Sequence, residues 1–170
     1  MSFKNKTAII TGGASGIGRA VGEKMARRGA VVILADRNAE MAGETARAIT
    51  ARGGRAAAAE LDVTNAQAFA DLINKTAEQH GRCDYLFNNA GVNIAAEARD
   101  LTLDDWNLII DVSLRGAIHG IHAVYPLMIK QGSGHIVNTA SIAGLSPFPL
   151  SAPYSAAKSA VVGLSVAPPG

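Results

Sequence analysis

The 170-residue sequence has few cysteines, few aromatic residues and little net charge. Cys83 is the only cysteine, which excludes an intrachain disulfide and a metal site built from several thiolates. The net charge is +2 and no basic run is longer than Arg27-Arg28, so we expect no nucleic-acid partner. No apolar stretch is long enough to span a bilayer, and the first residues lack a signal-peptide pattern. We therefore expect a cytoplasmic protein without a membrane partner.

What is present is a globular composition, with 48% hydrophobic and 18% charged residues. The length suits one substantial core, so we predict a single domain over residues 1–170. Strand-like apolar runs occur at Thr7–Thr11, Val31–Ala35, Ala56–Leu61, Tyr85–Asn88 and His135–Ala140. Helical patterns lie between them, at about Gly16–Arg28, Ala39–Ala51, Ala66–His80 and Leu103–Gln131. This alternation predicts a doubly wound α/β domain with a parallel sheet.

Local signals indicate where the helices begin and end. Thr64 is a candidate N-cap for the third helix, and Thr102 with Asp105 resembles a capping box. Gly132 stands where the long helix should stop. That helix is apolar around much of its circumference, so it either packs against a second subunit or is enclosed by its own chain.

A glycine-rich loop joins the first strand to the first helix. Its spacing, Gly12-x-x-x-Gly16-x-Gly18, matches neither the GxGxxG fingerprint nor a Walker loop. A helix N-terminus suits a pyrophosphate, although a tight turn alone would also explain the glycines. Asp36 ends the second strand and could accept hydrogen bonds from an adenosine ribose while repelling a 2′-phosphate. These features favour NAD over NADP, although Arg37 could still accommodate that phosphate.

Near the other end of the chain, Tyr154 and Lys158 stand four residues apart, so both side chains fall on one face of a helix. A neighbouring ammonium favours the ionised phenolate that acid/base chemistry requires. Such a pair is usually a half-buried aromatic beside a solvated lysine. The case for catalysis therefore depends on its companions, Ser141 upstream and the glycine loop.

Five motifs stand in a fixed order: Thr11–Gly18, Asp62-Val63, Asn88–Gly91, Ser141 and Tyr154–Lys158. Their order and spacing resemble those of the short-chain dehydrogenase/reductases over essentially the whole chain. The resemblance implies a Rossmann-type sheet with NAD across the carboxyl ends of its strands. It implies these cofactor-binding residues: Gly12, Ser15, Gly16, Ile17, Gly18, Asp36, Arg37, Asp62, Val63, Asn88, Ala90, Gly91, Tyr154 and Lys158.

The resemblance also implies a reaction, the interconversion of a small secondary alcohol and a ketone by hydride transfer. Tyr154 would be the general acid/base, Lys158 would assist it and hold the nicotinamide ribose, and Ser141 would bind the reacting oxygen. The apolar character of neighbouring residues suggests a substrate with a hydrocarbon skeleton: Asn93, Ile94, Ile142, Leu145 and Phe148. We further expect a homo-oligomer, a dimer or a tetramer.

The chain departs from the family at two places. Ser113 stands where the family usually carries a catalytic asparagine, and serine offers one donor where asparagine offers two. After the Tyr154–Lys158 helix the chain ends at Pro168-Pro169-Gly170, which we interpret as either a truncation or an internal deletion. We therefore expect a sheet without the family's last strands, with the fifth strand as an exposed edge.

These departures leave two alternatives to an active enzyme. The chain could be a catalytically silent nucleotide-binding remnant, or it could fold stably only as a subunit of an oligomer. Two smaller features carry little weight. His119 and His122 lack a third ligand at a suitable spacing for a metal site, and Cys83 is expected to be a small packing residue.

Overall fold

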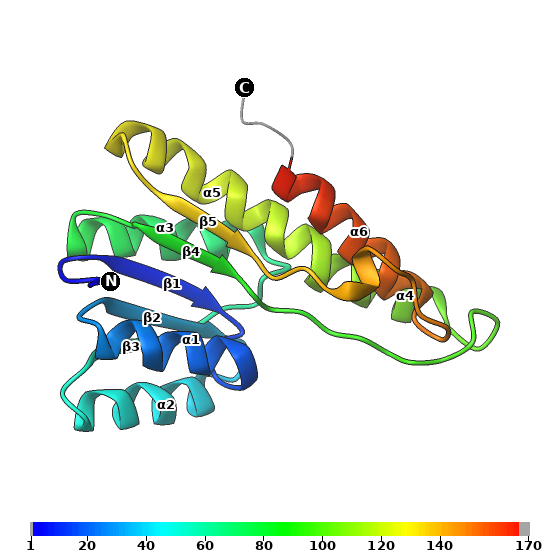
Figure 1. The fold of residues 1–170 in the computed structure, drawn as a ribbon, viewed down its shortest axis with the longest axis horizontal. Helices are drawn as coiled ribbons and strands as arrows, with labels where there is room; N and C mark the ends of the chain where they lie inside the picture. Colours follow the sequence, from blue (N-terminus) through cyan, green and yellow to red (C-terminus); the bar gives the residue numbers. More distant parts are fainter. Residues whose placement is uncertain (1, 167–170) are drawn as a thin grey trace.

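The computed structural model of the chain describes residues 2–166, and in this range it contains a five-stranded parallel sheet (Figure 1). The strand order is β3-β2-β1-β4-β5, and every neighbouring pair is parallel. The strands are β1 (Thr7–Thr11), β2 (Val31–Asp36), β3 (Arg55–Glu60), β4 (Tyr85–Asn88) and β5 (His135–Asn138). The structure thus confirms the doubly wound, Rossmann-type α/β fold.

Helices cover both faces of this sheet. They are α1 (Gly16–Arg27), α2 (Ala39–Ala51), α3 (Ala66–His80), α4 (Leu103–Ile110), α5 (Gly116–Gln131) and α6 (Ala152–Val166). One core cluster joins Ile10 and Leu34 to Met25 of α1 and Ile49 of α2. The other joins Ile9 and Ile33, which point to the opposite face of the sheet, to α3 and α5, and it includes the fully buried Phe69. Successive side chains of a strand point to opposite faces of the sheet, so the strands contribute residues to both cores.

The single long helix predicted for Leu103–Gln131 is wrong in one respect. The segment Asp111–Arg115 (η1) is a π-helical turn between α4 and α5. Within it, Ser113 is 2% exposed, and its hydroxyl exchanges hydrogen bonds with the backbone of Val92. Such a π-helical turn interrupts the regular i to i−4 hydrogen bonds of the helix, and here it coincides with the contact of Ser113 to Val92.

Most of the predicted helix boundaries hold. Thr102 and Asp105 form the capping box, and Gly132 ends α5 in the left-handed conformation with φ of 66°. The cap of α3 is Asn65 rather than Thr64, because the Asn65 side chain accepts the Ala68 N–H at 3.0 Å. The Thr64 hydroxyl instead donates to Asp62 at 2.8 Å. Strand ends moved slightly, since β3 ends at Glu60 and β5 at Asn138.

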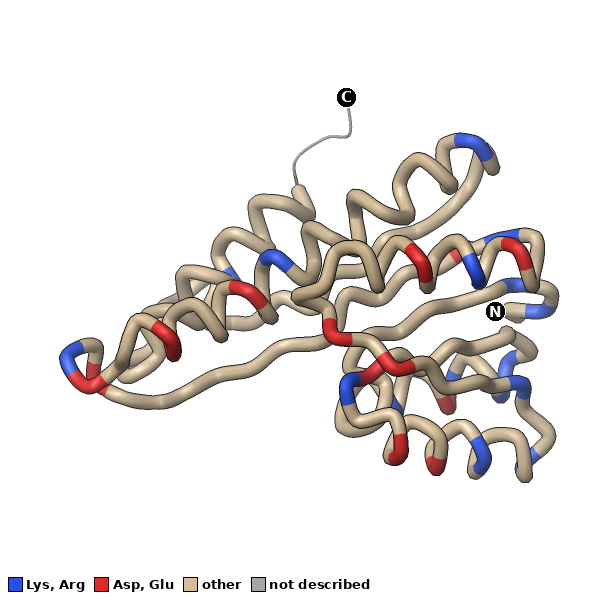
Figure 2. The backbone as a smooth tube through the Cα atoms, turned by 180° about the vertical axis from the view of Figure 1, so that it is seen from behind, with Lys and Arg blue, Asp and Glu red and all other residues tan. Residues whose placement is uncertain are grey.

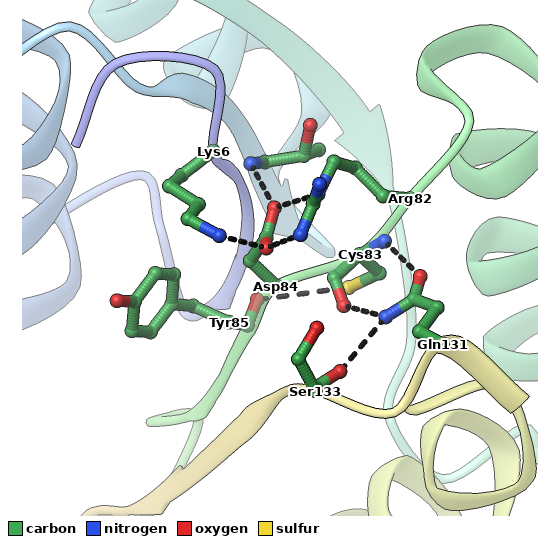
Figure 3. A network of polar contacts seen from close by, with 8 residues as sticks. Lys6, Arg82, Cys83, Asp84, Tyr85, Gln131 and Ser133 are labelled. Atoms are coloured by element: carbon green, nitrogen blue, oxygen red, sulfur yellow. Dashed lines mark hydrogen bonds and ion pairs between the residues drawn. The ribbon is translucent and has the colours of Figure 1, made fainter. Parts of the chain in front are cut away.

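A buried carboxylate fastens the amino ends of β1 and β4 (Figure 3). Asp84 is 3% exposed and accepts hydrogen bonds from Lys6 Nζ at 2.9 Å, Thr7 N at 3.0 Å and Arg82 Nε at 2.7 Å. Burial alone would raise the pKa of Asp84, but the bonds from Arg82, Thr7 and Lys6 outweigh it and hold the pKa below its usual range. Beside it, burial raises the pKa of the Cys83 thiol to about 12, as expected for a packing residue.

Among the described residues β5 lies at one edge of the sheet, as predicted. Its side chains are only partly covered, and Val137 is 40% exposed. Figure 2 shows acidic and basic residues interspersed along the described part of the chain. None of its helices has both the length and the apolar character needed to cross a membrane. The predicted Pro168-Pro169-Gly170 ending lies outside the described residues.

Candidate active site

A cavity of about 730 Å³ opens at the carboxyl ends of the strands. Such an edge is where parallel α/β sheets bind ligands, because loops and helix N-termini converge there. Most of the predicted site residues line this one cavity: Gly12, Ser15, Gly16, Ile17, Asp36, Arg37, Asp62, Val63, Ala90, Gly91, Tyr154 and Lys158. The remaining four, Gly18, Asn88, Ser113 and Ser141, do not line it.

Gly18 contributes to the site through its lack of a side chain. A Cβ at this position would overlap the carbonyl oxygen of Gly12 and would lie 2.7 Å from Asn89 Nδ2. The turn also needs left-handed backbone at Gly12 (φ 63°) and Gly16 (φ 53°), which glycine adopts without strain. Within residues 2–166 the Ser15 hydroxyl makes no cap hydrogen bond to α1. The N-terminus of a twelve-residue helix therefore meets the cavity with its donors available to an anion.

The loop after β4 is tied to the glycine loop through Thr11 and Asn89. Thr11 Oγ1 accepts the backbone N–H groups of Asn89 at 2.9 Å and Ala90 at 3.0 Å. The Asn89 side chain donates to Thr11 O at 3.0 Å and accepts from Thr139 Oγ1 at 3.3 Å. These contacts join the ends of β1, β4 and β5 into one rim of the cavity.

Of the two neighbouring asparagines, the structure places Asn89 on the cavity wall and Asn88 in the interior. Asn88 is 6% exposed, and its Nδ2 donates to Asn138 Oδ1 at 2.9 Å and to Ala117 O at 3.3 Å. Sequence reasoning selected Asn88 and did not select Asn89. The motif contains both residues, so the sequence signal was present but did not say which one faces the cavity.

On the opposite side of the cavity, two carboxylates meet backbone donors. Asp36 accepts the N–H groups of Ala14 at 3.1 Å and Asn38 at 3.0 Å, so it also anchors the glycine loop. Asp62 accepts the Thr64 N–H at 2.9 Å. The pKa of Asp62 lies below its usual value, mainly because of that N–H and then because of the Thr64 hydroxyl, with a smaller effect from Arg37. Asp62 is therefore anionic at neutral pH.

Tyr154 and Lys158 lie one turn apart on α6 and face the cavity together. Lys158 Nζ is 5.6 Å from the centre of the Tyr154 ring and donates to Thr139 O at 2.6 Å. Lys158 is 4% exposed, and this burial lowers its pKa. A buried ammonium with donors directed into a cavity can bind hydroxyl groups and can promote ionisation of a nearby phenol.

Ser141 and Ser113 lie at two short turns that pack against α6. Ser141 precedes the short 3₁₀ turn Ile142–Gly144 (η2), and its hydroxyl accepts the Ala143 N–H at 3.2 Å. Ser113 Oγ approaches the cavity wall from η1: a Cβ on Gly91 would lie 3.6 Å from both Ser113 Oγ and Lys158 Nζ. Of the residues expected beside the substrate, Asn93 lines the cavity, whereas Ile142, Leu145 and Phe148 are at least half exposed outside it.

Comparison with known proteins agrees with this arrangement. The sequence profile of the family described as short chain dehydrogenase matches residues 6–167. The chain belongs to the short-chain dehydrogenase family. It is 39% identical to the meso-2,3-butanediol dehydrogenase of Serratia marcescens over 165 residues, which cover 97% of this chain and 64% of that protein. An uncharacterized oxidoreductase of Listeria monocytogenes is 40% identical over 161 residues, covering 95% and 65%.

Solved structures of the family superimpose closely on this chain. One from Burkholderia phymatum in complex with NAD has a TM-score of 0.94 at 37% identity, covering 97% of this chain and 59% of that one. A metagenomic short-chain oxidoreductase in complex with NADP has a TM-score of 0.92 at 34% identity, covering 96% and 75%. The chain spans 64–65% of the two curated relatives described above. It is an oxidoreductase-family domain with a nucleotide-binding fold.

Proposed function

We propose that this chain binds NAD and interconverts a secondary alcohol and a ketone, with Tyr154 as the general acid/base. The observation that carries the proposal is a single cavity lined by Gly16 and Asp36 at one end and by Tyr154 and Lys158 at the other. A dinucleotide needs an anion-binding helix terminus, a ribose acceptor and a catalytic end within one site, and the residues that line this cavity would supply all three.

The fit is supported by the glycine cradle. A Cβ on Gly16 would meet open space, so its surface faces the cavity, whereas Gly18 allows α1 to approach Gly12 closely. Asp36 would accept the adenosine ribose hydroxyls, Asp62 and Val63 would border the adenine, and Lys158 would donate to the nicotinamide ribose. The bound nicotinamide would supply the hydride acceptor or donor.

The chain's own residues would handle the proton. In the oxidation direction the Tyr154 phenolate would accept the alcohol proton, and in reduction the phenol would return it. Lys158 would stabilise the ionised phenol electrostatically, since its ammonium lies beside that ring. The Ser141 hydroxyl would donate to the substrate oxygen where negative charge develops.

The decisive experiment compares the wild type with Tyr154→Phe. We expect a fall of at least about 100-fold in kcat with small ketones, and an NADH dissociation constant unchanged within twofold, because the ring and its packing remain. Tyr85→Phe is the matched control, since Tyr85 begins β4 at the amino end of the sheet and does not line the cavity. NADH binding without turnover in the wild type would support the silent-remnant alternative, and equal loss of binding and turnover in Tyr154→Phe would refute the assigned role.

Cofactor preference follows from Asp36. Its carboxylate would repel a 2′-phosphate, so we propose tighter binding of NADH than of NADPH. Asp36→Asn should lower the ratio of the NADPH and NADH dissociation constants by about tenfold, because it removes a charge but preserves size. Arg37→Ala tests the opposing residue. If Arg37→Ala weakens NADPH binding by a larger factor than Asp36→Asn strengthens NADPH binding, the proposed preference for NAD is wrong.

We also propose a homo-oligomer formed through α5. An apolar groove beside it is lined by Ile118, Ile121, Tyr125 and Leu164, and Ile118 is 41% exposed. Sedimentation of the wild type and of Ile118→Glu measures this directly. A dimer or tetramer that the substitution dissociates supports the proposal, and a monomeric wild type refutes it.

A further inference from the structure

His119 contacts the loop that borders the adenine end of the cavity. It lies on α5, and its Nδ1 is 2.9 Å from the carbonyl oxygen of Val63. A carbonyl oxygen only accepts, so Nδ1 carries the hydrogen in this contact. The bond joins residues 56 positions apart, and so it connects two elements that the local sequence does not connect.

The loop in question is Leu61–Thr64, which follows β3 and precedes α3. All four of its residues line the cavity. At its start, the Leu61 N–H donates to Asp36 O at 3.0 Å. In its middle, α5 contacts Val63 twice, one turn apart, through His119 and through Gly116. A Cβ on Gly116 would lie 2.8 Å from Val63 Cγ2, so the helix and the loop are in direct contact.

We propose that His119 is a positioning residue for the adenine half of the cofactor. By fixing the Val63 carbonyl it holds Asp62 and Val63 in the cavity wall, where they would meet the adenine. The inference rests on the proposed cofactor function. If ligand binding had to order this loop, the ordering would cost binding free energy. A hydrogen bond that already exists in the unliganded protein removes part of that cost.

The experiment uses two substitutions at His119 and one control. His119→Ala removes the donor, whereas His119→Asn places an amide nitrogen at the position that Nδ1 occupies. His122→Ala is the matched control, because His122 lies one turn further along α5, is exposed, and does not line the cofactor cavity. His122 borders the groove proposed for oligomer contact, so sedimentation must first show that this variant assembles as the wild type does. Thermal unfolding of all three shows that differences in binding do not come from loss of fold.

Calorimetric titration with AMP and with NADH gives the ligand readout. We expect His119→Ala to raise both dissociation constants by about tenfold. His119→Asn should recover most of that affinity, and His122→Ala should match the wild type. In steady state, His119→Ala should raise KM for NADH with kcat at saturation unchanged, because the residue does not touch the reacting atoms. Unchanged AMP affinity in His119→Ala would overturn the proposal.

Amide hydrogen exchange of residues 61–65 without ligand separates this inference from the cofactor function. Faster exchange in His119→Ala than in His122→Ala shows that His119 fixes the loop, and equal exchange refutes it. A wild type that binds neither AMP nor NADH would overturn the proposed function and the ligand role of the loop together. Normal nucleotide binding in His119→Ala would overturn the positioning role alone.

Discussion

The Ser113 hydroxyl both donates to and accepts from the backbone of one residue, Val92. Ser113 Oγ lies 3.1 Å from Val92 O and 3.2 Å from Val92 N. This serine is therefore bound to the wall of the cavity. It holds the loop after β4 at the level of Gly91, which lies next to Lys158 Nζ.

Ser113→Ala should lower the free energy of unfolding by about 2 kcal/mol, because two backbone groups in a partly buried region lose their partner. Urea denaturation measures this difference. Ser159→Ala is the control, since the Ser159 hydroxyl makes one exposed bond to Gly144 O, and it should cost less than about 0.5 kcal/mol. Equal midpoints for the two variants would show that the Val92 contacts carry no stability.

Lys158→Met should abolish turnover and raise the free energy of unfolding at pH 7. Burial lowers the pKa of Lys158, so the unfolded state holds this proton more tightly and folding bears a desolvation cost. That cost lessens as pH rises through the lowered pKa and vanishes above about pH 10.4. Denaturation at pH 7, 9 and 10 should therefore show the advantage of the variant shrinking. A less stable variant at pH 7 would contradict this account.

Asp84→Asn should destabilise the protein by about 2 kcal/mol at pH 7. The Lys6 ammonium, the Arg82 guanidinium and the Thr7 N–H would then no longer donate to a buried negative charge. The pKa of Asp84 is lowered on folding, so its contribution is complete above about pH 3.9 and is lost as pH falls through the lowered value. Denaturation at pH 7, 5 and 3 should show wild type and variant converging in acid. Asp71→Asn, on the exposed surface of α3, removes one carboxylate without breaking a buried contact, and it serves as the control that should change stability little at pH 7.

Gly18→Ala should lose NADH binding and stability together. Alanine is favoured over glycine in a helix by about 1 kcal/mol, but here its Cβ would overlap Gly12 O and displace Asn89. Gly163→Ala, in α6, is the matched control, because a Cβ there meets nothing within 4 Å. It should stabilise the protein slightly without changing NADH affinity. Calorimetry and thermal unfolding of both variants measure the contrast, and normal NADH binding in Gly18→Ala would contradict it.

The sequence was sufficient to predict the strand and helix order, because alternating apolar runs and helical periodicity depend on neighbouring residues. The sequence also predicted that Gly16, Asp36 and Tyr154 lie at one edge of the sheet. Consecutive parallel strands in this fold end at the same edge, so residues that follow them converge in space. The break in the helix at Ser113 was not predictable from periodicity, since the apolar pattern continues through it.

What the sequence by itself determined is therefore the architecture, the family and the elements that carry the candidate site. Only the tertiary structure decided that Asn89 rather than Asn88 lines the cavity, that Ser113 binds Val92, and that His119 holds Val63. The physical reason is the range of the contacts. Ser113 and Val92 are 21 positions apart, and His119 and Val63 are 56 apart. Such contacts depend on how distant elements pack, which no local pattern records.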